Sequence, residues 1–301
     1  MLKKRLKKAL IYNIFFLWAL LLISCSHFIG ARKDPASRFV KDTGILGTWW
    51  WWVEPEDQNS HLNFAAENGV NEIYYYTQNF DSQTSAFIKK ARNRGIKVFL
   101  LLDDINYIWD YDKFIGIMNK YIAYQNKAPE KSKFAGLHLD LEPLLLPGFE
   151  ENKEDFLQDY LDFVVWVCSR YQSGPGFISP AVTIDFDIPY WYDNDVAYRG
   201  GKIKLYQALI IEADRVFVMS YRDTAQKTYE ASKKEVAFAG SLGKQIILGA
   251  ETGRVDETPE DSYYGKGRDF FYEQLHELHQ LVEYGNYGLS IHHIGSWYLM
   301  P

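Results

Sequence analysis

Cysteine is nearly absent from this sequence, which contains only Cys25 and Cys168 among its 301 residues. Cys168 lies in the apolar stretch 163–168, which is typical of a buried helical thiol rather than a reactive one. No cluster of cysteine and histidine has the spacing of a zinc site, and the adjacent pair His292-His293 has no third ligand at a suitable spacing. The sequence therefore predicts neither a metal site nor a cofactor.

A glycine-rich phosphate turn is also missing, since Gly44-Ile45-Leu46-Gly47 does not supply one. Positive charge is scarce, with 33 Lys and Arg against 39 Asp and Glu and a formal net charge of −6. This acidity argues against a nucleic-acid partner. Aromatic residues, by contrast, are plentiful, with 9 tryptophans and 22 tyrosines. They suit either the stacking platforms of a sugar-binding cleft or a large aromatic core, and composition does not decide between the two.

The N-terminus has the composition of an export signal. Five of the first eight residues are Lys or Arg, and the following run Ala9–Ile23 is apolar apart from Tyr12 and Asn13. This run is shorter than the stretch of about 20 apolar residues that a stable membrane span needs. A basic segment followed by a short apolar one is typical of a secretory signal.

The segment Leu22-Ile23-Ser24-Cys25 resembles the lipobox of bacterial lipoproteins. The resemblance implies that residues 1–24 are a signal peptide and that Cys25 becomes the lipidated first residue, because several acyl chains anchor a protein firmly. Residues 25–42 would then be a tether and residues 43–301 a folded domain outside the cytoplasm, on a membrane of the bacterial cell envelope. A plain signal anchor that happens to contain a cysteine is the alternative.

After residue 42, β-rich runs alternate with amphipathic stretches that carry helix signals. Alternating β and α units predict a parallel sheet, and eight of them predict a single-domain (β/α)8 TIM barrel of the α/β class. A doubly wound open sheet is the alternative. The chain stops soon after the eighth run, so the usual last helix is expected to be missing or supplied from elsewhere. The runs are Ile45–Trp52, Glu72–Tyr76, Lys97–Asp103, Gly136–Glu142, Ser179–Asp185, Arg215–Tyr221, Gln245–Glu251 and Leu289–Ile294.

Reacting groups in this fold lie at the C-terminal ends of the strands and in the loops that follow. On the fourth run, His138, Asp140 and Glu142 alternate, so their side chains leave the same face of the strand, toward the barrel interior. Neighbouring carboxylates push their pKa values apart, so that one stays protonated and can act as an acid near neutral pH. A structural ion-pair network with Arg222 or Arg254 as counter-ion is the alternative.

The segment Gly136-Leu137-His138-Leu139-Asp140-Leu141-Glu142 resembles the fourth-strand signature Asp-Gly-x-Asp-x-Asp-x-Glu of the chitinase-like family 18 glycoside hydrolases. The resemblance implies that Glu142 is the proton donor and that Asp140 orients the acetamido group of the substrate. Met219-Ser220-Tyr221 is similar to the family's Met-x-Tyr, whose Tyr contacts the reacting sugar, and Trp297 would lie at the bottom of the pocket. Three features depart from the family pattern, namely His138, Ala135 and the Arg222 that precedes Asp223.

A second resemblance involves Leu141-Glu142-Pro143 together with Glu251 on the seventh run. They are similar to the acid/base and the nucleophile of the large clan of retaining glycosidases, although Leu141 replaces the usual Asn. Two carboxyl groups about 5–5.5 Å apart would then give a covalent intermediate. Glu142 is the acid in both interpretations, whereas Glu251 only lines the cleft in the first.

Several further residues are candidates for contact with a sugar. Trp52 is the expected platform, because two of the tryptophans at 49–52 should face the barrel and two the helices. Asp103 or Asp104 would bind a hydroxyl or cap the following helix. The remaining candidates for substrate binding are His138, Asp223, Trp297 and the loop Tyr190–Tyr192.

Taken together, these patterns predict a membrane-anchored glycoside hydrolase of the cell envelope with a carbohydrate substrate, N-acetylated if the family 18 resemblance holds. A sugar-binding barrel without catalytic activity and a structural lipoprotein whose acidic rim binds a protein are the other classes. Fold alone does not choose among them, because this barrel supports many functions.

Overall fold

The computed structural model describes residues 44–51, 53–172, 176 and 183–301. The expected signal peptide, Cys25, the tether and Trp52 lie outside these residues. Within the described part of the chain, no helix is both long enough and apolar enough to cross a membrane.

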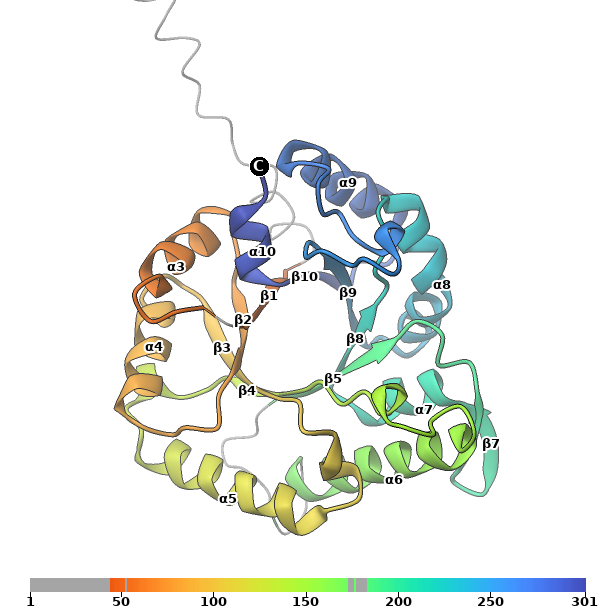
Figure 1. Ribbon diagram of the computed structural model, residues 1–301. Helices are drawn as coiled ribbons and strands as arrows, with labels where there is room; N and C mark the ends of the chain where they lie inside the picture. The colour runs from red at the N-terminus through yellow and green to blue at the C-terminus, as the bar shows by residue number, and fades with distance from the viewer. Residues whose placement is uncertain (1–43, 52, 173–175, 177–182) are drawn as a thin grey trace, which may run out of the picture. The chain divides into compact units, whose positions relative to one another are not determined.

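Eight parallel strands close into a barrel (Figure 1). The order around it is β1-β10-β9-β8-β5-β4-β3-β2, with β1 paired to both β2 and β10. This confirms the (β/α)8 barrel, and the doubly wound open sheet is wrong. The strands are β1 Leu46–Trp50, β2 Glu72–Tyr76, β3 Lys97–Leu102, β4 Gly136–Leu139, β5 Thr183–Pro189, β8 Arg215–Met219, β9 Gln245–Glu251 and β10 Tyr287–His292.

Helices surround the barrel (Figure 1). They are α3 Gln58–Glu67, α4 Ser82–Arg92, α5 Tyr111–Lys127, α6 Lys153–Tyr171, α7 Leu205–Glu212, α8 Ala225–Leu242, α9 Arg268–Leu281 and α10 Ile294–Leu299. The connections contain 3₁₀ turns and one hairpin, namely η1 Ile105–Ile108, η2 Glu130–Ser132, η3 Pro143–Leu145, η4 Pro259–Asp261 and the antiparallel strands β6 Asp195–Tyr198 and β7 Gly201–Lys204. Asp81 caps α4 as expected, since its side chain accepts from the amides of Gln83 and Thr84.

Several strand boundaries and the last helix differ from the prediction. β1, β3, β4 and β8 each end one to three residues before the predicted end. β5 continues to Pro189 because Asp185 and Asp187, read as the polar end of the strand, are buried in its middle, where they have polar partners. β10 begins and ends two residues earlier than predicted, because His293 leaves the strand to cap α10. The last helix is therefore present in a short form.

Side chains alternate along β1 as the pleat of a strand requires. Trp49 and Trp51 belong to the buried cluster inside the barrel, together with Tyr74. Trp50 instead packs outward against Phe87 of α4, with ring centroids 4.9 Å apart. The expected division of the tryptophans between barrel and helices is confirmed for these three.

Arg215 holds two acidic side chains inside the barrel, near the N-terminal ends of the strands. Its Nε and Nη2 donate to Asp185 at 2.9 and 2.6 Å, and its Nη1 donates to Glu72 at 2.9 Å. The three side chains are 8%, 0% and 4% exposed. In the alternative interpretation, Arg222 or Arg254 was the counter-ion of the acids after β4. Arg222 instead pairs with Asp261, and Arg254 pairs with Asp256.

We expect Arg215→Leu to destabilise the fold by about 3–5 kcal/mol, because it leaves Glu72 and Asp185 buried without a counter-charge. Urea unfolding at pH 7 measures the change. The matched control is Arg254→Leu, which removes an ion pair of two 67% exposed side chains and should cost about 1 kcal/mol or less. Equal losses in the two variants would contradict a structural role for the buried network.

Candidate active site

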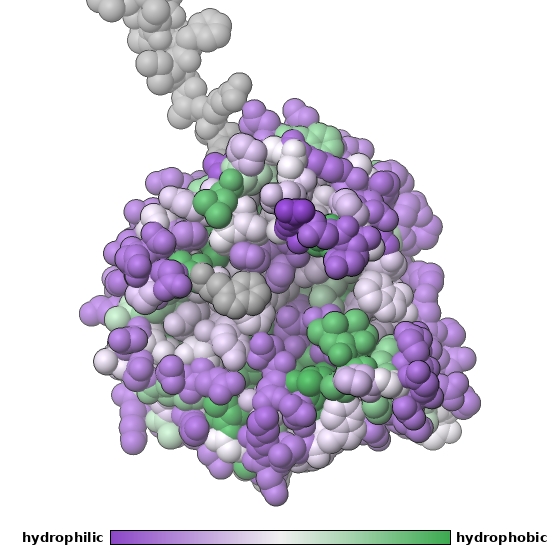
Figure 2. All heavy atoms as spheres, viewed as in Figure 1, coloured by the Kyte–Doolittle hydropathy of each residue, from purple (hydrophilic) through white to green (hydrophobic). Residues whose placement is uncertain are grey.

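The candidate site lies at the C-terminal ends of the barrel strands. Figure 2 looks onto this face, where hydrophilic residues lie in and around a central hollow. β4 and β10 are opposite one another in the closed order, since three strands separate them in either direction. Side chains that follow these two strands therefore approach the centre from opposite sides.

His138 of β4 is fully buried beneath this hollow. Its Nε2 lies 2.7 Å from Asp187 Oδ2, and its Nδ1 lies 3.8 Å from Asp185 Oδ2. The ring stacks on Tyr74, with centroids 4.2 Å apart, and meets the edge of Phe217. Burial lowers the pKa of His138, but the charge of Asp187 and the hydrogen bonds to both carboxylates outweigh it and raise that pKa to about 8. Asp187 and Asp185 thus favour the protonated form of His138.

Asp140 and Glu142 follow β4 rather than lying on it, because the strand ends at Leu139 and not at Glu142 as predicted. Burial raises the pKa of Glu142 to about 7, and the charge of Asp187 adds to the effect while His292 opposes it. Burial together with the charges of Asp187 and Glu142 raises the pKa of Asp140 well above its usual range. The Oδ1 atom of Asp140 is buried and accepts no hydrogen bond from any described residue. Both groups therefore retain protons at a pH where exposed carboxyls have lost them.

Asp187 is the carboxylate that the sequence analysis did not select. Its Oδ2 accepts from His138 and, at 3.2 Å, from the indole Nε1 of Trp49, while Oδ1 is buried with no partner among the described residues. Trp49 belongs to β1, which is opposite β5 in the barrel, so its side chain spans the interior under the site. The alternation Asp185-Phe186-Asp187 was the available signal, because it places both acids on the face of β5 that turns inward.

Tyr221 follows β8, and its ring lies against Gly249 of β9. A Cβ atom at position 249 would be 2.8 Å from Cε1 of Tyr221, so only glycine allows this approach. Burial, followed by the charges of Glu251 and Asp187, raises the pKa of Tyr221 well above its usual range. The phenol therefore stays protonated and can donate a hydrogen bond among carboxylates.

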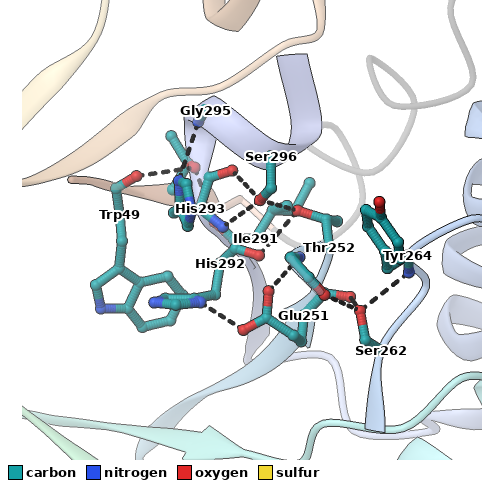
Figure 3. A network of polar contacts seen from close by, with 12 residues as sticks. Trp49, Glu251, Thr252, Ser262, Tyr264, Ile291, His292, His293, Gly295 and Ser296 are labelled. Atoms are coloured by element: carbon teal, nitrogen blue, oxygen red, sulfur yellow. Dashed lines mark hydrogen bonds and ion pairs between the residues drawn. The ribbon is translucent and has the colours of Figure 1, made fainter. Parts of the chain in front are cut away.

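Glu251 ends β9 and is engaged by neighbouring groups at both oxygens. Its Oε2 lies 2.6 Å from Nδ1 of His292, and its Oε1 accepts from the amide of Gly253. Figure 3 shows His292 and Glu251 facing one another, with Trp49 next to the imidazole. The side chain of His292 is 24% exposed and that of Glu251 only 8%. His292 is thus the more accessible member of the pair, and the sequence analysis had considered it only as a metal ligand.

The two adjacent acids after β3 have different roles. Asp104 caps η1, accepting from the amide of Asn106 at 3.1 Å, and pairs with Lys113. Asp103 remains exposed, and its charge contributes to the raised pKa of Asp140. Of the two alternatives weighed for this pair, Asp104 is the cap, and Asp103 stays a candidate for contact with a ligand.

Two other predicted residues, Trp297 and Asp223, lie away from the centre or are already paired. Trp297 is 0% exposed and packs against Phe64 of α3, with centroids 5.0 Å apart, so its expected position at the bottom of the pocket is wrong. This happens because the chain enters α10 before reaching Trp297. Asp223 pairs with Lys227 at 2.8 Å and with Lys266. Both carboxylate oxygens of Asp223 thus already have a charged partner, and fewer hydrogen-bonding positions remain for a substrate.

Arg222 joins the loop after β5 to the loop after β9. It pairs with Asp261 of η4 and donates to the hydroxyl of Tyr190. In the loop after β5, next to Tyr190, Trp191 is 45% exposed, whereas Tyr192 is buried. Arg222 therefore fixes two rim loops to one another. Across residues 44–51, 53–172, 176 and 183–301, no group of three His, Cys, Asp or Glu side chains is arranged to hold a metal ion.

No family model matches this chain, and no curated protein matches it either. Among solved structures it is similar to the spore cortex-lytic enzyme SleL of Bacillus cereus, with 17% identity, a TM-score of 0.43 and coverage of 69% of this chain and 51% of that one. It is also similar to the chitinase ICChI of Ipomoea carnea, at 11% identity and TM-score 0.48 over 84% and 96% of the chains. A putative deoxyribose-phosphate aldolase of Toxoplasma gondii has 13% identity and TM-score 0.47 over 88% and 94%. The chain spans about half of SleL, and these likenesses extend to the barrel fold alone.

We expect Asp187→Asn to lower the pKa of Glu142 from about 7 toward its ordinary value, because the charge of Asp187 is one of its causes. The shift should be partial, since burial contributes more. Carbon-13 NMR titration of the Glu142 carboxyl measures it without any substrate. Asp112→Asn, on the exposed surface of α5, is the control and should leave the value unchanged. An unchanged Glu142 titration in Asp187→Asn would contradict the proposed proximity of the two groups.

Proposed function

We propose that this protein is a glycoside hydrolase with Glu142 as its general acid. The observation that carries the proposal is the position of Asp140 and Glu142 directly after β4 at the C-terminal end of the barrel, with a buried Asp140 oxygen that has no partner among the described residues. Burial at this position raises the pKa of Glu142 to about 7 and that of Asp140 well above its usual range. A glycosidase needs a carboxylic acid that is still protonated near neutral pH to protonate the leaving oxygen. An acidic rim that merely bound a protein would not require two buried carboxyl groups with raised pKa values.

The groups around Glu142 support the same chemistry. Asp140 presents a buried Oδ1 that accepts no hydrogen bond from a described residue, and Tyr221 presents a protonated phenol. Both suit hydrogen bonds to a sugar and to its ring substituents. Below them, His138 fixes Asp187, whose charge contributes to the raised pKa of Asp140. Preorganised groups of this kind stabilise developing charge at little reorganisation cost.

The substrate that we propose is an N-acetylated glycan, with Asp140 as the carboxyl that orients the acetamido group. This follows the fourth-strand resemblance to family 18, in which His138 occupies the position of an inner Asp. A carboxylate is nevertheless close to that position, because Asp187 of the adjacent strand bonds His138. The chain thus keeps an acid, an orienting carboxyl and a third carboxylate, although from two strands rather than one.

Location forms part of the proposal. The basic and apolar N-terminus with its Leu-x-Ser-Cys segment supports export and lipidation at Cys25. The enzyme would then act at the surface of a membrane in the bacterial cell envelope, on glycans outside the cytoplasm. Mass spectrometry of the membrane fraction, with Cys25→Ser as comparison, tests this anchor separately from catalysis.

We expect Glu142→Gln to reduce hydrolysis of a panel of aryl glycosides and N-acetylglucosamine oligomers by about 10²–10⁴-fold, the usual contribution of a general acid. The loss should be smallest for aryl leaving groups that need no protonation. Glu150→Gln, an exposed residue of the following loop, makes the same chemical change and should keep full activity. Binding of oligomers without hydrolysis in the unmodified protein would leave a sugar-binding barrel instead.

The pH profile should follow the Glu142 proton. The acid works only while protonated, so kcat/KM should decline as pH rises through about 7, the pKa of this group. Asp187→Asn should move this limb to lower pH, because it removes a charge that holds the proton on Glu142. If kcat/KM of Asp187→Asn declines at the same pH as that of the unmodified protein, another group is the acid.

A further inference from the structure

The pair formed by Glu251 and His292 has the arrangement of an oriented base. Nδ1 of His292 lies 2.6 Å from Glu251 Oε2, and the amide of Gly253 donates to the other oxygen of that carboxylate. A carboxylate at Nδ1 keeps the proton on that nitrogen and leaves a lone pair on Nε2. No described residue bonds Nε2, and the side chain is 24% exposed at the site.

The imidazole of His292 is also fixed by its backbone and by two rings. Its carbonyl accepts from the amide and the hydroxyl of Thr252, at 2.8 and 2.9 Å. Trp49 contacts the ring edge-on with centroids 5.6 Å apart, and Tyr221 lies at 5.9 Å on a tilt of 31°. A ring held in this way presents Nε2 in one direction, which a general base requires.

His292 and Glu142 lie on opposite sides of the barrel mouth. β10 is separated from β4 by β9, β8 and β5 in one direction and by β1, β2 and β3 in the other. A sugar bound between them would have the acid on one face and the imidazole on the other. Inverting glycosidases place two carboxyl groups on opposite faces of the sugar, about 6.5–9.5 Å apart, so that a water molecule fits on the base side. His292 would take the place of the second carboxyl.

Glu251 itself is poorly placed to be the nucleophile of a retaining enzyme. Both its oxygens have close donors, and its side chain is only 8% exposed. A carboxylate that attacks an anomeric carbon must present an oxygen to it. The arrangement instead makes Glu251 a positioning residue that acts through His292.

We propose that His292, oriented by Glu251, is the general base for hydrolysis with inversion, an assignment that rests on the proposed glycosidase function. In one step the water oxygen bonds to the anomeric carbon as the glycosidic C–O bond breaks. Nε2 of His292 takes one proton of that water, and Glu142 gives its proton to the leaving oxygen. The products are a hemiacetal of inverted configuration and the free alcohol. Solvent then carries the proton from His292 back to Glu142.

The first test is proton NMR of the initial product, using the full chain and an oligomer that the unmodified protein hydrolyses. Release of the inverted anomer is expected. Release of the retained anomer would overturn the assignment of His292 while leaving the hydrolase intact, because retention requires the substrate acetamido group or a carboxylate as nucleophile. Absence of hydrolysis by the unmodified protein would overturn both the proposed function and this inference.

The second test removes the base and supplies it again. His292→Ala should reduce kcat by about 10²–10⁴-fold, and added imidazole should restore part of the rate in this variant but not in Glu142→Gln. His292→Gln keeps an amide donor for Glu251 and should fold normally, yet remain inactive. His276→Ala, on the exposed surface of α9, is the matched control. Loss of activity in His292→Ala without rescue, in a folded protein, would assign His292 a structural role and overturn the proposal.

A third measurement needs no substrate. Nitrogen-15 NMR of neutral His292 should show the tautomer with hydrogen on Nδ1, and Glu251→Gln should reduce its population together with kcat. A neutral ring that carries its hydrogen on Nε2 would have no lone pair facing the site and would overturn the assignment.

Discussion

Asp140, Glu142 and Asp187 share the mouth of this barrel with His138, whose pKa Asp187 and Asp185 raise to about 8. His138 lies 2.7 Å from Asp187, so that single contact compensates one carboxylate and leaves Asp140 and Glu142 to be stabilised in another way. In a medium of low polarity, uncompensated carboxylates retain their protons. The acid chemistry of the site therefore depends on a shortage of positive charge at its centre.

The same balance of charge extends down the barrel. Asp185 alternates with Asp187 on β5 and is held by Arg215, which also binds Glu72. Asp187, Asp185 and Glu72 each contact a basic side chain. Asp140 and Glu142 form no ion pair with a described residue. The ion pairs of Arg215 with Asp185 and Glu72 have to be complete, because an unpaired buried carboxylate there would compete with Asp187 for His138. The structural ion pairs and the reactive carboxyls are thus parts of one arrangement.

The sequence predicts most of what depends on local order. The alternation of runs predicts the barrel, and the polar residues at the end of the fourth run predict that Asp140 and Glu142 lie at the C-terminal end of β4. What it does not predict depends on which strands are neighbours or opposite. Arg215 serves Asp185 because β8 pairs with β5, and Trp297 moves away from the site because β10 ends early. These relations arise only when the barrel closes, so no spacing along the chain reveals them.

Because β4 and β10 are opposite one another in the barrel, the proposed acid Glu142 and the proposed base His292 act on the sugar from two sides. A positive charge on His292 lowers the pKa of Glu142, so an imidazolium would favour loss of the proton that the acid has to donate. A neutral imidazole, in turn, removes that influence and offers the lone pair that water needs. A neutral imidazole therefore leaves the proton on Glu142, as the acid requires. After one turnover the imidazole is positive and Glu142 negative, and because these charges attract one another, exchange with solvent has to return the proton against that attraction.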